Sequence, residues 1–164
     1  FNNSDCQLLL LGKGKTMEDH KKLAKDLGVE DKIIFYGFTE NPYKYLSKSD
    51  CFILSSDFEG FPNVLLEAMA CETPIISTDC PTGPRELLSP ETDYTKLLTG
   101  DLELTDNGIL VPVNDSDILS KAMKLAFEDQ DLLDGFKKNA SKRARDYNIE
   151  NVIGEIREIL ERNS

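Results

Sequence analysis

The chain has 164 residues, of which 40% are apolar, so it can bury one sizeable core, and a single domain over residues 1–164 is expected. Its formal net charge of -11 argues against nucleic acid as a partner, because phosphate binding requires clustered Lys and Arg. No apolar run approaches the roughly 20 residues that span a bilayer, and the sequence opens on no signal pattern, so a cytoplasmic location is expected.

Short apolar runs alternate with amphipathic segments in the first part of the chain. The runs are apolar on both faces, as parallel strands covered by helices must be, and lie at residues 7–11, 33–35, 51–54, 74–77 and 108–111. Helical patterns fall between them at residues 17–27, 42–48 and 62–70. This alternation predicts an α/β fold with a Rossmann-like, doubly wound parallel sheet flanked by helices.

The second part of the chain is helical after Asp115, with breaks near Asp129 and at residues 147–149, which predicts two or three helices. Before it, residues 89–107 form an unusually long connection rich in Asp and Thr, and connections of that length often carry function. The cysteines form no CxxC pair, so reduced, mostly buried thiols are expected rather than a zinc site or a redox motif.

Glu67 interrupts the apolar pattern of residues 62–70. Pro62 is suited to the first turn of this helix, and Asn63 and Glu67 lie four residues apart on one face, while nearly all other positions are apolar. A helix that is apolar almost all round is expected to be buried. An isolated carboxylate there costs several kcal/mol unless something hydrogen-bonds to it, so Glu67 requires a partner.

Two kinds of partner fit Glu67. One is structural, an internal Arg or a backbone cap; the other is a ligand with paired hydroxyls, such as a ribose. The start of the helix favours the ligand, because N–H groups near Gly60, Phe61, Asn63 and Val64 attract an anion. Ligands of open parallel sheets bind at the carboxyl ends of strands, which is where Glu59 and Gly60 follow residues 51–54. A ribose beside a phosphate indicates a nucleotide.

The segment EGFPNVLLE at residues 59–67 resembles the E-x7-E motif of group 1 retaining glycosyltransferases, which have the GT-B fold. Further matches follow in the same order over nearly the whole chain: GKG at 12–14, KIIFYGF with Gly37, TPIISTDCPTGPREL and NGILVPV. The resemblance implies that this chain is the carboxy-terminal, donor-binding half of that fold, without the strand and helix that normally come first.

The resemblance also assigns roles to matching residues. Glu59 would hydrogen-bond hydroxyls of the donor sugar, and Glu67 would hold the ribose diol. Gly37 and Phe38 would border the base. The backbone that would meet the diphosphate and the sugar belongs to Gly60, Phe61, Pro62, Asn63 and Val64. No cofactor and no obligatory metal are implied, because the nucleotide-sugar is itself a substrate.

Substrates and partners follow from the same resemblance. The motif DCPTGPREL is similar to members that use a UDP-hexose or UDP-N-acetylhexosamine in surface polysaccharide assembly. The acceptor would be a glycan or a lipid-linked glycan. The amino-terminal domain of the same enzyme would complete the cleft, and the parent enzyme would act in the cytoplasm, peripherally at the inner membrane face. The chain alone is expected to be inactive.

Several alternatives compete with these assignments. Residues 12–15 (GKGK) are interpreted as a surface turn rather than a phosphate cradle, and a hydrolase pair of Glu59 and Glu67 is disfavoured because Glu67 lies inside an apolar helix. Arg85 is either a cation for the donor or a member of a surface ion pair. A function of another class is a flavodoxin-like signalling module phosphorylated at Asp57.

The missing first strand leads to a prediction about pairing. In strand order 3-2-1-4-5-6 that strand lies between the runs at residues 7–11 and 51–54. Unpaired backbone groups inside a sheet cost roughly 1–3 kcal/mol each. The two runs are therefore expected either to pair directly or to leave a gap that another segment or chain fills.

Overall fold

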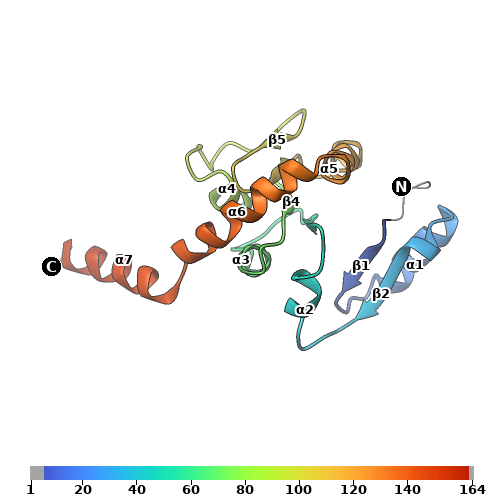
Figure 1. Cartoon of the computed structure of the whole chain (residues 1–164), viewed down its shortest axis with the longest axis horizontal. Helices are drawn as coiled ribbons and strands as arrows, with labels where there is room; N and C mark the ends of the chain where they lie inside the picture. The colour runs from blue at the N-terminus through green and yellow to red at the C-terminus, as the bar shows by residue number, and fades with distance from the viewer. Residues whose placement is uncertain (1–5, 163–164) are drawn as a thin grey trace. The chain divides into compact units, whose positions relative to one another are not determined.

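The computed structural model describes residues 6–162, and the chain forms two compact units, residues 1–42 and 43–164. Each unit is described by itself (Figure 1). The predicted fold class is confirmed: parallel strands alternate with helices that flank them.

The first unit is a β-α-β arrangement. Strand β1 (Leu8–Leu11) leads into helix α1 (Met17–Asp26), a 3-10 turn η1 (Glu30–Lys32) follows, and β2 (Ile33–Gly37) returns parallel to β1. The parallel pairing requires the crossover helix, and α1 supplies it.

The second unit is built on a sheet of order β3-β4-β6-β5. Strands β3 (Phe52–Leu54), β4 (Ile75–Thr78) and β6 (Ile109–Val111) are parallel, and β5 (Glu103–Leu104) pairs antiparallel with β6. Within its own unit, β1 pairs with β2, and β3 pairs with β4. Residues 7–11 and 51–54 belong to different units, so their direct pairing, or a segment that fills the gap between them, stays a prediction.

Helix α1 is the α-helix of the first unit, and six α-helices of the described residues belong to the second unit. They are α2 (Tyr43–Leu46), α3 (Asn63–Ala70), α4 (Pro84–Leu88), α5 (Ser116–Glu128), α6 (Gln130–Asp146) and α7 (Ile149–Arg162). The predicted breaks near Asp129 and residues 147–149 are confirmed, and Asp129 caps α6 by accepting a hydrogen bond from the N–H of Leu132.

The core of the second unit lies on both faces of its sheet, because side chains alternate along each strand. On β4, Ile75 joins a cluster with residues of α3 and α4, while Ile76 joins a second cluster with α5. Helix α6 contributes to both clusters, through Ala140 to the first and Phe136 to the second. Gly108 is required between β4 and β6, because a Cβ there would lie 2.6 Å from the carbonyl oxygen of Ile75.

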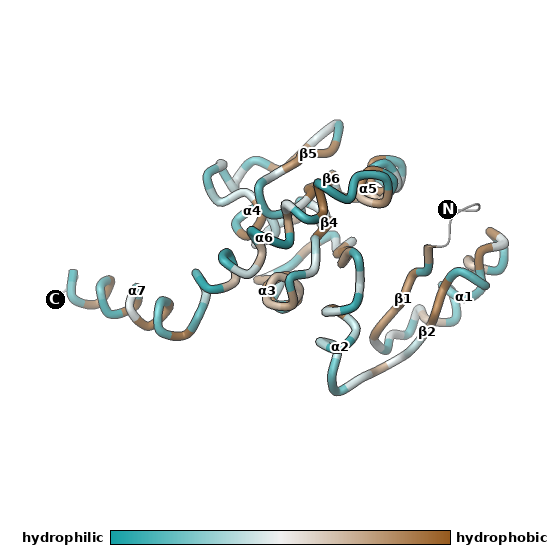
Figure 2. Tube along the Cα trace, viewed as in Figure 1, coloured by the Kyte–Doolittle hydropathy of each residue, from teal (hydrophilic) through white to brown (hydrophobic). Residues whose placement is uncertain are grey.

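Helix α7 differs from the others because none of its residues is buried. Its apolar side chains recur every three or four residues, and apolar and polar positions alternate along it in Figure 2. No helix within residues 6–162 is both long and apolar enough to cross a bilayer.

Candidate functional site

Two loops meet at the carboxyl ends of β3 and β4. Residues 55–62 follow β3, residues 79–83 follow β4, and backbone hydrogen bonds tie them together. The N–H of Glu59 donates to the carbonyl of Pro81 at 2.8 Å, and the N–H of Thr82 donates back to the carbonyl of Glu59 at 2.8 Å. The Thr82 hydroxyl adds a bond to the carbonyl of Gly60 at 2.6 Å. The segment that carries Glu59 is thus held at the edge of the sheet where ligands of parallel α/β folds bind.

A close approach fixes the end of this segment. Gly83 has φ of +100°, and a Cβ on it would lie 2.3 Å from Cδ of Pro62. Pro62 is buried and immediately precedes α3, which begins at Asn63, one residue later than expected. Only glycine therefore lets the loop after β4 pack against the start of α3.

Glu59 is partly buried, and its carboxylate has one hydrogen bond within the described residues. Its Oε1 accepts from the Ser56 hydroxyl at 2.7 Å. Because a carboxylate can accept about four hydrogen bonds, most of its capacity remains available. Ser56 was not singled out from the sequence, since a serine in a loop carries no specific signal.

Glu67 is partly buried rather than enclosed. The expectation of a fully buried helix is wrong: α3 turns Leu65, Ala68 and Met69 toward the core, whereas Val64 is 40% exposed. The physical reason is that neighbouring elements cover only the stripe that repeats every three or four residues. In residues 6–162 no hydrogen bond or ion pair reaches the Glu67 side chain, so the internal Arg and the backbone cap that we considered are both absent from this part of the chain.

The N–H groups near the start of α3 are mostly unengaged. The expectation fails for Asn63, whose N–H donates to the carbonyl of Phe61 at 2.9 Å. For Gly60, Phe61 and Val64, the structure gives no acceptor within residues 6–162. These donors lie at or just before the amino-terminal end of α3, where the helix dipole is positive, so an anion is favoured there.

Gly37 and Phe38 belong to the first unit. Gly37 ends β2 with φ of +84°, and its carbonyl accepts from the N–H of Gly12 at 2.8 Å. The Lys13 ammonium lies 5.3 Å from the centre of the Phe38 ring, a cation-π distance. A hollow of about 220 Å³ is lined by Gly12, Lys13, Gly14, Met17, Lys21, Phe35 and Gly37. The GKG turn thus lies beside Gly37 within this unit.

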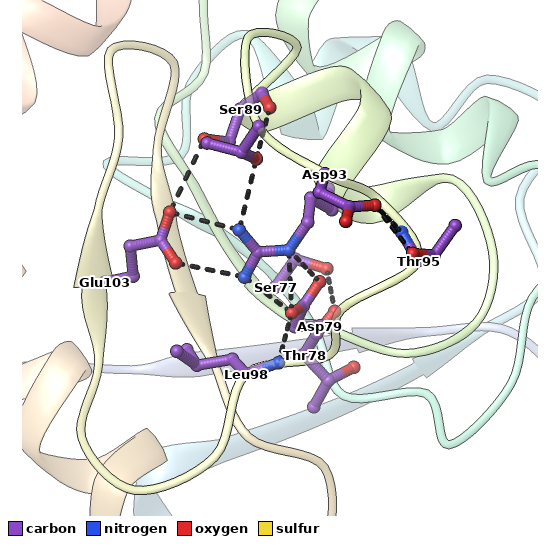
Figure 3. Close-up of polar contacts among 10 residues, drawn as sticks. Ser77, Thr78, Asp79, Ser89, Asp93, Thr95, Leu98 and Glu103 are labelled. Carbon is purple, nitrogen blue, oxygen red and sulfur yellow. Dashed lines mark hydrogen bonds and ion pairs between the residues drawn. The ribbon is translucent and has the colours of Figure 1, made fainter.

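Arg85 is neither a free cation nor part of a surface pair, the two alternatives drawn from the sequence. It is 7% exposed, and its guanidinium donates to two carboxylates, those of Asp79 and Glu103, which are labelled in Figure 3. Its Nη2 is 2.7 Å from Oδ2 of Asp79 and 3.0 Å from Oε2 of Glu103. Thr92 accepts from Nη1 at 3.2 Å, and the N–H of Leu98 donates to Asp79 at 2.6 Å.

This cluster anchors the long connection at residues 89–107. Burial lowers the pKa of Arg85, but hydrogen bonds and charges from Asp79 and Glu103 outweigh burial and leave the pKa raised. All donors of the guanidinium are engaged, so the cluster is structural. A second hollow, of about 530 Å³, is lined by Arg85, Thr92, Asp93, Lys96, Leu97, Leu98, Thr99 and Glu103. Asp79 and Glu103 were missed because nothing local marks a carboxylate that meets an arginine across the fold.

The cysteines and the possible metal ligands add no second site. All four cysteines are free, as expected; Cys80 is buried, whereas Cys6, Cys51 and Cys71 are partly buried, so the expected burial is complete only at Cys80. Burial raises the pKa of the Cys51 thiol to about 12, which makes it unreactive near neutral pH. Within residues 6–162, no three His, Cys, Asp or Glu side chains are grouped to hold a metal ion.

Solved structures support the fold. HepE of Anabaena, crystallised with UDP, is 23% identical, with a TM-score of 0.77 over 95% of this chain and 41% of that one. A sucrose-phosphate synthase of Thermosynechococcus elongatus is 26% identical, with a TM-score of 0.72 over 96% of this chain and 39% of that one. The fold is therefore that of known glycosyltransferases.

Sequence comparison identifies the family. A glycosyltransferase of Methanocaldococcus jannaschii is 33% identical over 96% of this chain and 42% of its own length. An N-acetylgalactosaminyltransferase of Campylobacter jejuni that acts on a diphospho-undecaprenol-linked sugar is 36% identical over 87% of this chain and 35% of its own. The chain thus spans less than half the length of these relatives. The family model for glycosyl transferases group 1 matches residues 2–143, and the chain therefore belongs to that family.

Proposed function

We propose that this chain is the donor-binding part of a retaining glycosyltransferase. It binds a nucleotide-sugar, either a UDP-hexose or a UDP-N-acetylhexosamine, for transfer to a glycan or lipid-linked acceptor in surface polysaccharide assembly. Gly60 to Val64 meet the diphosphate, Glu67 holds the ribose diol, and Glu59 contacts hydroxyls of the sugar. Gly37 and Phe38 border the base.

One observation carries this proposal: donors without acceptors adjoin a carboxylate without a partner. The N–H groups of Gly60, Phe61 and Val64 suit a diphosphate, and Glu67 lies one turn further along the same helix. A partly buried carboxylate without a partner contributes no stabilising contact to the fold, so its presence is better explained by a ligand than by folding. The loop that carries these groups is fixed in advance by its bonds to Pro81 and Thr82, which lowers the entropy lost on binding.

The substrate class draws support from relatives. The Campylobacter jejuni relative is named for the transfer of N-acetylgalactosamine, and a Salmonella typhimurium relative, 38% identical over 52% of this chain, is named a lipopolysaccharide 1,6-galactosyltransferase. Both names describe hexose or N-acetylhexosamine transfer onto surface glycans or their lipid-linked precursors. We extend that substrate class to this chain.

A second, amino-terminal domain closes over the exposed loop and supplies the acceptor site, in the cytoplasm and peripherally at the inner membrane face. No metal is obligatory, because helix and backbone donors can offset the diphosphate charge. The chain alone therefore binds nucleotide but shows no turnover.

Nucleotide titration tests the proposal. UDP, GDP and ADP are titrated calorimetrically against the chain and against the protein extended by an amino-terminal domain, with and without EDTA. UDP is expected to bind more tightly than GDP and ADP, and EDTA is expected to change nothing. Absence of nucleotide binding in both forms would contradict the proposal.

The stereochemistry of transfer is a separate test. The extended protein is given candidate UDP-sugars, and the anomeric configuration of the product is read by NMR. Retention is expected, and an inverted product would exclude the assigned mechanism.

The alternative function, a signalling module phosphorylated at Asp57, is not supported. The chain belongs to a glycosyltransferase family, and Asp57 is an exposed residue of the loop after β3.

A further inference from the structure

Residues 60–64, which we propose contact the diphosphate, include Phe61, and Phe61 packs against Tyr147 at the carboxyl end of α6. The rings of Phe61 and Tyr147 lie 5.7 Å apart between centroids and are inclined at 46°, within the range of favourable aromatic pairs. Phe61 is 40% exposed, so the protein covers its ring only in part. Tyr147 therefore limits the movement of a side chain that is otherwise open to solvent.

Tyr147 is itself held by Arg143, one turn earlier on α6. Nη2 of Arg143 donates to the Tyr147 hydroxyl at 2.9 Å, and the guanidinium carbon lies 4.9 Å from the centre of the ring. The same guanidinium donates to the carbonyls of Glu86, at 2.6 Å, and Leu87, at 3.0 Å, near the end of α4. The ring is thus connected to α4 by a side chain whose donors are engaged.

Residues 61–62 are linked to α4 by two separate sets of contacts. Helix α4 begins at Pro84, directly after Gly83, and Gly83 packs on Pro62. Pro62 is the neighbour of Phe61, and Phe61 meets Tyr147. The site segment is therefore supported at two adjacent residues, from the loop after β4 on one side and from the end of α6 on the other.

We propose that Tyr147 is a positioning residue for nucleotide-sugar binding. Its ring holds Phe61, and through Phe61 it keeps the N–H groups of Gly60, Phe61 and Val64 in the orientation that receives the diphosphate. Arg143 holds the ring in turn. The assignment of these N–H groups to the diphosphate rests on the proposed function, whereas the support given to the segment does not.

Four variants of the chain test this role by amide hydrogen exchange and UDP titration. Tyr147→Leu keeps apolar bulk but removes the ring, and Tyr147→Ala removes both. Tyr147→Phe keeps the ring and its contact with Phe61. Phe136→Leu is the matched control. Phe136 is a buried aromatic of α6 in the cluster of Ile76, whereas Tyr147 packs against the cluster of Ile75, so this change lowers stability without reaching Phe61.

The expected result is local. In Tyr147→Leu and Tyr147→Ala, amides of residues 60–64 exchange faster relative to those of β4, and UDP affinity falls roughly 3- to 10-fold, the size of an aromatic contact. Tyr147→Phe keeps the ring and the cation-π contact with Arg143 but loses the hydrogen bond from Arg143, so it changes both measurements less than Tyr147→Leu does. Phe136→Leu raises exchange evenly across the unit and leaves UDP affinity unchanged.

Other outcomes overturn the inference. If Tyr147→Leu and Phe136→Leu give the same even rise in exchange, Tyr147 only adds stability. If Tyr147→Leu speeds exchange of residues 60–64 but leaves UDP affinity unchanged, the segment does not orient the nucleotide. If the wild type binds no nucleotide, the proposed function fails, and the exchange data alone decide whether Tyr147 positions the segment.

Discussion

Two polar regions flank the loop after β4, and they differ in how completely their charges are satisfied. Around Arg85, two carboxylates, a hydroxyl and a backbone N–H form a closed set in which every donor of the guanidinium has an acceptor. Around Glu67, a carboxylate and several N–H groups have no counterpart within residues 6–162. The first region joins parts of the fold, whereas we propose that a ligand completes the second.

Changes around Arg85 are therefore expected to lower the stability of the fold, and changes at Glu67 are expected to weaken ligand binding. A buried charge that is fully paired destabilises the protein strongly when one partner is lost. A partly exposed charge without a partner adds little to stability, so its removal is felt where its ligand binds. Each of the following changes tests that separation.

Arg85→Met should have the largest effect. It leaves Asp79, which is 1% exposed, without its cation, and is expected to lower the free energy of unfolding by about 3–5 kcal/mol. Urea denaturation at low temperature measures the loss, and UDP affinity per folded molecule should stay unchanged. A stable Arg85→Met variant that binds UDP poorly would reverse the roles of the two regions.

Gly83→Ala should affect both regions, because Gly83 lies where they meet. The added Cβ would overlap Pro62 in a backbone conformation that disfavours side chains, at a cost of about 2–4 kcal/mol, and displacement of Pro62 should weaken UDP binding. Gly100→Ala is the matched control, because Gly100 has φ of +94° but open space around it. Equal losses of stability in the two variants would show that the contact with Pro62 contributes nothing.

Glu67→Gln should weaken UDP binding by roughly 1–3 kcal/mol, through loss of charged hydrogen bonds to the ribose. Its free energy of unfolding should change by less than about 0.5 kcal/mol, because the carboxylate has no partner to lose. Calorimetry and urea denaturation measure the two quantities. Glu59→Gln serves as the control, since it should spare UDP binding and lower the turnover of the protein extended by an amino-terminal domain. Equal loss of UDP affinity in both variants would contradict the separate roles of Glu59 and Glu67.

Lys121→Met should have the smallest effect. Lys121 and Asp101 form an exposed ion pair, and the hydrogen bond from Lys121 lowers the pKa of the Asp101 carboxyl. A lowered carboxyl pKa gives stability that is present above the ordinary pKa and is lost as the pH falls through the folded value. The variant should therefore raise the pKa of Asp101 toward its ordinary range, as measured by NMR titration, with little change in unfolding at neutral pH. A loss as large as that of Arg85→Met would show that exposure does not separate these ion pairs.

The sequence predicted the elements whose signal is local. Runs that are apolar on both faces located β1, β2, β3, β4 and β6, and interruptions of the helical pattern located the breaks near Asp129 and at residues 147–149. Strand β5 was missed, because its two residues carry no apolar run and it exists through antiparallel pairing with β6. Short edge strands of this kind depend on their neighbour more than on their own residues.

The sequence by itself determined the α/β class, the helix that carries Glu67 and the position of Glu59 and Gly60 after a strand. These follow from periodicity and from the rule that ligands bind at the carboxyl ends of parallel strands. Only the tertiary structure decided which charges are satisfied. Asp79, Arg85 and Glu103 meet because the sheet brings the ends of separate elements together, and Glu67 stays partly open because neighbouring elements cover a single stripe of α3. Periodicity reports which face of a helix is apolar, but burial depends on which other elements pack against that face.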